Sequence, residues 1–73
     1  MLDKSLAVFW NEIEHDLYEE NGHIFGIEID LFNDHKIYYC KFIKNGVETY
    51  RYLDDDMLNA IEQFNNILKE GKI

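Results

Sequence analysis

The dipeptide Asn45-Gly46 constrains the fold of this chain more than any other feature. Both central positions of a type I′ turn need positive φ, which asparagine and glycine tolerate, and such a turn joins two paired strands. Alternating runs flank the dipeptide over residues 36–44 and 47–53. We therefore predict a β-hairpin whose register places Lys44 opposite Val47 and Tyr39 opposite Tyr52.

A third strand is predicted immediately before this hairpin. Residues 23–32 alternate between apolar and polar side chains, and Leu31 falls on the apolar side. Period-two alternation with β-branched residues is typical of a half-buried strand. Turn residues follow at Asn33-Asp34-His35.

Two other segments have helical spacing. In residues 3–20 the apolar positions recur at steps of three and four, and Asn21-Gly22 is suited to end a helix. A second apolar stripe follows Asp54-Asp55-Asp56, whose carboxylates suit a helix start, and Gly71 suits its end. The predicted fold class is α+β: a single α-β-β-β-α domain over residues 1–73, with a three-stranded antiparallel sheet and both helices packed on one face.

Composition and charge restrict the function. The 73 residues include 15 acids and seven bases, for a formal net charge of -8, which excludes a simple nucleic-acid binder. One cysteine excludes a disulfide framework and a zinc site built from paired cysteines. No apolar run is long enough for a signal peptide or a membrane span. The expected location is cytoplasmic, without membrane contact.

The acids gather in the first half of the chain. On the predicted first helix, Glu12, Asp16, Glu19 and Glu20 share a flank away from the apolar stripe. With Glu14 they recur about every 3 Å along the helix, close to the roughly 3.4 Å per charge of one DNA strand. This flank is either an ordinary solvated surface or a binding face for a basic protein.

Catalytic and metal-binding patterns are weak. Cys40 has no histidine at a spacing that would make it a nucleophile, and no glycine-rich loop precedes a helix. Glu12 and His15 form a single Glu-x-x-His motif, whereas di-metal bundles need two copies and further carboxylates. We expect no enzyme, no catalytic residue, no metal or other cofactor and no small-molecule substrate.

The predicted order of elements is similar to that of the double-stranded-RNA-binding domain. Asn33-Asp34-His35-Lys36 falls where that family has a short loop containing histidine. The family grips phosphate with lysines at the start of its second helix, and this chain has Asp54-Asp55-Asp56 there. The resemblance therefore implies the fold without its usual ligand, and we expect no direct binding to nucleic acid.

In size, charge and layout the chain is also similar to small acidic phage-encoded inhibitors, including some anti-CRISPR proteins. The expected function is a non-enzymatic protein-interaction domain, and its sharper form is an inhibitor of phage or mobile-element type that presents the acidic helix to a basic, nucleic-acid-handling protein. The alternative is a structural or assembly homodimer whose acidic surface serves solubility only. A homodimer is expected in either case, because one sheet face would expose apolar and aromatic side chains, namely Ile37, Tyr39, Ile43, Tyr50 and Tyr52.

Overall fold

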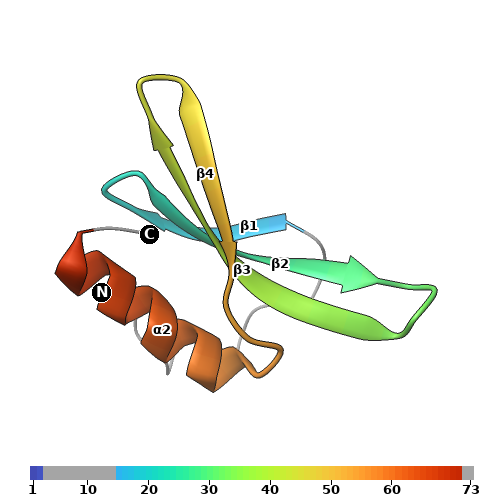
Figure 1. Cartoon of the computed structure of the whole chain (residues 1–73). Helices are drawn as coiled ribbons and strands as arrows, with labels where there is room; N and C mark the ends of the chain where they lie inside the picture. The colour runs from blue at the N-terminus through green and yellow to red at the C-terminus, as the bar shows by residue number, and fades with distance from the viewer. Residues whose placement is uncertain (3–14, 72–73) are drawn as a thin grey trace.

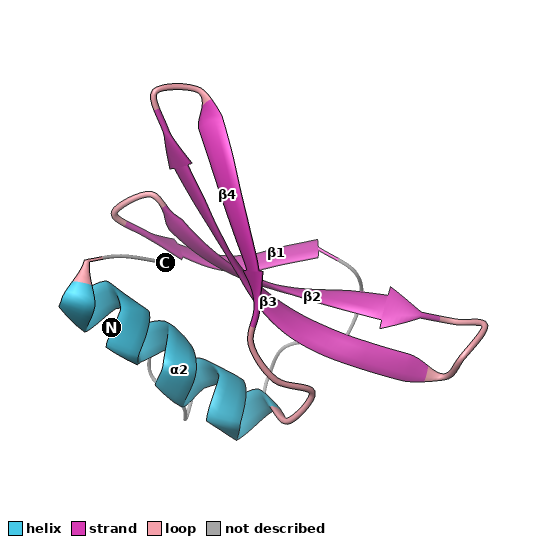
Figure 2. Cartoon of the chain, in the orientation of Figure 1, coloured by secondary structure: helices cyan, strands magenta, loops and turns pink. Residues whose placement is uncertain are grey.

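The computed structural model describes residues 1–2 and 15–71. In this part of the chain four strands precede a helix: β1 (His15–Glu20), β2 (His23–Asp30), β3 (His35–Lys44), β4 (Val47–Tyr52) and α2 (Met57–Glu70). Neighbouring strands pair antiparallel in the order β1-β2-β3-β4, and α2 lies against one face of the sheet (Figures 1 and 2). The α+β class is confirmed. The predicted α-β-β-β-α order with two helices is wrong, because a fourth strand precedes the three predicted ones.

The hairpin of β3 and β4 has the predicted register. Tyr39 pairs with Tyr52, and Lys44 pairs with Val47. Asn45 and Gly46 have φ angles of 53° and 77°, as a turn with two positive φ values requires. The local chemistry of the dipeptide was therefore sufficient to predict the pairing of two strands.

Residues 15–20 form strand β1 and not the end of the predicted first helix; residues 3–14 of that prediction lie outside the described residues. Asn21 and Gly22 have φ angles of 53° and 84°, and they turn the chain into β2. A helix end and a type I′ turn both use positive φ, so this dipeptide fits either structure. Pairing with β2 decides for the strand, because it bonds the β1 backbone and packs Tyr18 against the core.

Helix α2 covers β2 and β3 and provides four of the nine described residues in the buried core cluster. Asp56 caps its first turn by accepting a hydrogen bond from the Asn59 amide, and Gly71 ends it with a φ of 74°, both as predicted. The buried cluster, with Leu2 from the start of the chain, consists of Leu2, Phe25, Ile27, Tyr38, Cys40, Ala60, Ile61, Phe64 and Ile67. No helix in the described segments has the length and apolar character that crossing a membrane requires.

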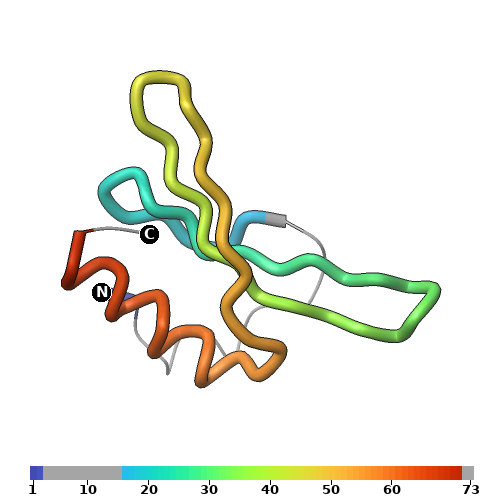
Figure 3. The backbone as a smooth tube through the Cα atoms, in the orientation of Figure 1, coloured from blue at the N-terminus to red at the C-terminus, as the bar shows by residue number. Residues whose placement is uncertain are grey.

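The turn between β2 and β3 differs from the prediction. Strand β2 ends at Asp30, so Leu31 lies in the turn with 87% of its surface exposed, and Phe32 is 101% exposed. The Asp30 carboxylate accepts hydrogen bonds from the amides of Phe32 and Asn33 and from the Asn33 side chain. These bonds fold the chain back before residue 31 can join the ladder. In Figure 3 this hairpin and the one made by β3 and β4 extend in different directions from the centre of the twisted sheet.

Candidate functional site

The sheet face opposite α2 carries a hydrogen-bonded group of tyrosines and charged side chains. Because side chains alternate along a strand, Tyr39 lies on the face opposite to the buried Tyr38 and Cys40. Its cross-strand partner Tyr52 shares that face. We define the tyrosine face by Asp16, Glu28, Tyr39, Lys41, Tyr50 and Tyr52.

Glu28 is the centre of this face. Its carboxylate accepts hydrogen bonds from the hydroxyls of Tyr50 and Tyr52, the latter at 3.0 Å. The Tyr50 ring stacks on Tyr39 with centroids 4.8 Å apart and meets Tyr52 edge to face at 5.3 Å. Burial and the bond to Glu28 raise the pKa of Tyr50, and the bond to Glu28 raises that of Tyr52. Both hydroxyls therefore stay protonated at neutral pH and hold the carboxylate as donors.

Asp16 forms a second anchored carboxylate on the same face. It accepts a hydrogen bond from the Tyr39 hydroxyl and one from Lys41 Nζ at 3.2 Å. The register of β1 shifts between Asp16 and Tyr18, which is a β-bulge. The extra residue lets Asp16 face the tyrosines while Tyr18 packs against the core on the other side.

Gly26 makes room for the Tyr39 ring. An ideal Cβ on Gly26 would lie 2.2 Å from Tyr39 Cζ and 2.3 Å from its hydroxyl oxygen. Glycine is therefore the only residue that allows the ring to lie flat over β2 and reach Asp16. A glycine inside a strand is a signal of close approach, but the strand alternation alone does not say which side chain approaches.

The predicted acidic helix surface is wrong for its described members. Asp16, Glu19 and Glu20 lie on strand β1, and Glu12 lies outside the described residues. Each of the three is bonded within the fold: Glu19 accepts the Gly22 amide at 2.8 Å, and Glu20 accepts the Tyr18 hydroxyl at 2.6 Å. Glu19 and Glu20 are neighbours in a strand and therefore lie on opposite faces, so the three carboxylates do not form one row.

The five residues predicted to line a dimer interface lie on the open face of the sheet. Tyr39 is only 5% exposed, because Tyr50 and Gly26 enclose its ring. Ile43, Tyr50 and Tyr52 remain 43%, 41% and 52% exposed, and Ile37 is half-buried beside Tyr52. Sequence alternation therefore placed these residues together, although it did not identify Glu28, which orders the tyrosines.

Chemistry at Cys40 and metal binding have little support in the described residues. Cys40 is fully buried, and burial raises the pKa of its thiol to about 11 despite the nearby Arg51. A thiol in this state is a poor nucleophile. Residues 1–2 and 15–71 contain no group of three side chains arranged to hold a metal ion. The Glu12–His15 motif lies outside the side chains that the structure describes.

The chain matches no protein-family model, no curated protein and no solved structure. The likeness to the double-stranded-RNA-binding domain depended on the α-β-β-β-α order, which strand β1 contradicts.

Proposed function

We propose that this chain is a non-enzymatic protein-interaction domain that presents the tyrosine face to a basic segment of a nucleic-acid-handling protein. One observation carries the proposal: Glu28 is held by two tyrosine hydroxyls on an accessible face. A carboxylate fixed in this way needs little reordering when a cation approaches, which favours binding. The tyrosine rings around it attract cations through their π faces.

The charge on this side of the sheet supports a basic partner. Five carboxylates, those of Asp16, Glu19, Glu28, Asp30 and Glu48, lie on the open face of the described strands, with one lysine, Lys41. Such a face repels the nucleic-acid backbone and attracts the proteins that bind it. We therefore transfer the proposed inhibitory surface from a helix to the sheet. In the cytoplasm, the domain would act by covering a basic surface that nucleic acid would otherwise use.

Three labelled probes test the proposal: a peptide of alternating arginine and serine, a length-matched peptide of glutamate and serine, and a duplex RNA. Fluorescence anisotropy is measured at low and at physiological salt. We expect binding of the arginine peptide alone, weakening as salt rises. Glu28→Gln should weaken it about tenfold, equivalent to about 1.4 kcal/mol. The matched control is Glu70→Gln, which removes one charge from α2 on the other side of the sheet and should have little effect.

Two results would contradict this function. If Glu28→Gln and Glu70→Gln reduced the affinity for the arginine peptide equally, binding would depend only on the net charge of the domain. Salt-sensitive, sub-micromolar binding of the duplex RNA would mean that the domain itself handles nucleic acid.

A structural homodimer through the same face is the second candidate, favoured by the exposure of Ile43, Tyr50 and Tyr52. Two copies related by a twofold axis would face each other with the same acidic surface, so added salt should strengthen the dimer by screening repulsion. A basic partner gives the opposite salt dependence. Sedimentation at low and high salt, over a range of protein concentrations, separates the two candidates. A monomer at every concentration and salt would exclude the homodimer.

A further inference from the structure

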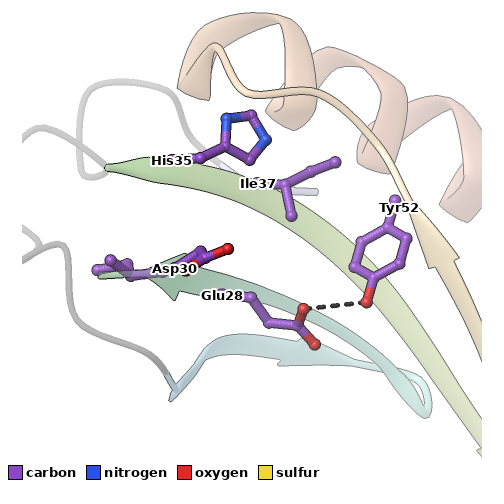
Figure 4. A pocket seen from close by; sticks show the side chains of 6 residues that line it. Glu28, Asp30, His35, Ile37 and Tyr52 are labelled. Atoms are coloured by element: carbon purple, nitrogen blue, oxygen red, sulfur yellow. Dashed lines mark hydrogen bonds between the residues drawn. The ribbon is translucent and has the colours of Figure 1, made fainter. Parts of the chain in front are cut away.

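An open pocket of about 270 Å³ lies at one end of the tyrosine face. It is lined by Glu28, Ile29, Asp30, His35, Ile37 and Tyr52 (Figure 4). It forms where β4 leaves the sheet. The residue pairs of the β4–β3 ladder end at Tyr52, and the chain keeps two further backbone hydrogen bonds to Tyr38, through Leu53 and Asp54. Strand β3 continues beside β2 back to His35, and on this end of the sheet Ile37 forms a floor beside the Tyr52 ring.

The walls of the pocket combine a fixed negative charge with flat and apolar surfaces. Tyr52 donates its hydroxyl to Glu28 across the Ile37 side chain (Figure 4). Each carboxylate oxygen of Glu28 accepts one tyrosine hydroxyl and has a second lone pair for a further donor. The ring of Tyr52 is 52% exposed, and the imidazole of His35 lies at the other end of the pocket.

We propose that this pocket receives the guanidinium group of an arginine side chain from the basic segment. The inference rests on the proposed function and specifies its ligand. A planar guanidinium has paired donors that match both oxygens of one carboxylate, and it stacks on aromatic rings. Glu28 supplies the carboxylate, Tyr52 the ring and Ile37 an apolar contact for the methylene groups. A lysine ammonium is a compact, strongly hydrated charge that uses neither the paired oxygens nor the ring plane as fully.

The other carboxylate in the pocket has a different role. Asp30 Oδ1 already accepts two hydrogen bonds from the amides of the turn that follows β2, and Oδ2 accepts one from the Asn33 side chain, whereas each Glu28 oxygen accepts only one from a tyrosine hydroxyl. The bond from the Asn33 side chain lowers the pKa of Asp30, which keeps it ionised. Asp30 therefore adds negative potential and holds the turn, while Glu28 is the carboxylate that contacts the guanidinium.

Small probes locate the pocket directly. N-acetylarginine amide and N-acetyllysine amide are titrated into the isotope-labelled protein, and NMR follows the methyl signals of Ile37 and the ring signals of Tyr52. We expect the arginine probe to shift both sets and the lysine probe to bind about tenfold more weakly. Glu28→Gln should abolish the preference for arginine. Tyr52→Leu, at a half-exposed position, should weaken the arginine probe without unfolding the chain, and Glu70→Gln is the matched control.

Peptides distinguish failure of this inference from failure of the proposed function. If neither the arginine–serine peptide nor a lysine–serine peptide binds, the proposed function fails. If both peptides bind with equal affinity, the proposal of a basic partner is supported and the proposal of an arginine pocket is overturned. An arginine probe that leaves Ile37 and Tyr52 unshifted, or Ca²⁺ shifting the same signals more strongly than arginine does, also overturns the pocket.

Discussion

Gly26 leaves no room for a side chain beneath the ring of Tyr39. Because a Cβ would lie 2.2 Å from Tyr39 Cζ, Gly26→Ala must push the ring away from Asp16 and Tyr50. We expect the free energy of unfolding to fall by about 1–3 kcal/mol, as for overpacked cores. Urea unfolding measures the change.

A double-mutant cycle supplies the control for this prediction. In a Tyr39→Ala background the clash is absent, so Gly26→Ala should be neutral or slightly stabilising. If Gly26→Ala lowered the free energy of unfolding equally in both backgrounds, a clash with the Tyr39 ring would not be the cause.

His23 is a buried polar side chain that makes no side-chain hydrogen bond to the described residues. It is 5% exposed and stacks on Phe42 with centroids 4.3 Å apart, and within residues 1–2 and 15–71 neither ring nitrogen has a hydrogen-bond partner. An unsatisfied buried polar group destabilises by about 1–3 kcal/mol. His23→Leu removes both nitrogens and loses the stacking, which is worth about 0.5–1.5 kcal/mol. We expect a net gain of about 1 kcal/mol in the free energy of unfolding, whereas His23→Asn, which keeps polar atoms buried, should be destabilised. If His23→Leu were less stable than wild type, the contacts of the imidazole ring would stabilise the fold by more than its unsatisfied nitrogens destabilise it.

At the scale of elements, the start of α2 depends on one of three consecutive aspartates. The Asp56 carboxylate accepts the Asn59 amide at 3.0 Å, while Asp54 accepts the Asp56 amide at 2.9 Å. Asp56→Ala should lower the free energy of unfolding by about 1 kcal/mol, the usual effect of losing an N-cap. Asp55→Ala, at an exposed neighbour, should change it by less than about 0.5 kcal/mol. Thermal melts of both variants test this, and equal shifts would mean that general charge, not the cap, matters.

For the whole molecule, several groups predict loss of stability at alkaline pH. Burial raises the pKa of Cys40 from 9.0 to about 11, and the pKa values of Tyr18, Tyr50 and Tyr52 are also raised. Above pH 9 the unfolded chain therefore releases protons that the folded chain keeps, so the folded state binds more protons and stability falls as pH rises. Cys40 alone contributes a slope of up to about 1.4 kcal/mol per pH unit between pH 9 and 11.

Urea unfolding at a series of pH values measures this slope. With each variant compared to its own stability at neutral pH, Cys40→Ala should lose less free energy of unfolding than wild type just above pH 9. The loss at higher pH, which the tyrosines cause, should persist. A free energy of unfolding that stays constant between pH 8 and pH 11 would contradict the burial of these groups.

Signals confined to a few residues were sufficient for half of the fold. Asn45-Gly46 determines the β3–β4 register, because a two-residue turn with two positive φ angles directly pairs the residues on either side of it. Asp56 and Gly71 determine the ends of α2 for the same reason. Alternation along β3 and β4 also predicted which aromatic side chains share a face, since a strand's period needs no knowledge of its partners.

Only the tertiary structure decided the rest. Asn21-Gly22 has the same chemistry as Asn45-Gly46, and whether it ends a helix or turns a hairpin depends on β1 finding the free edge of β2. The bond between Glu28 and Tyr50 spans 22 residues, and that between Asp16 and Tyr39 spans 23. No local pattern encodes such contacts. They exist because strand pairing, a bulge in β1 and the missing side chain of Gly26 bring separate segments of the chain to one place on the sheet.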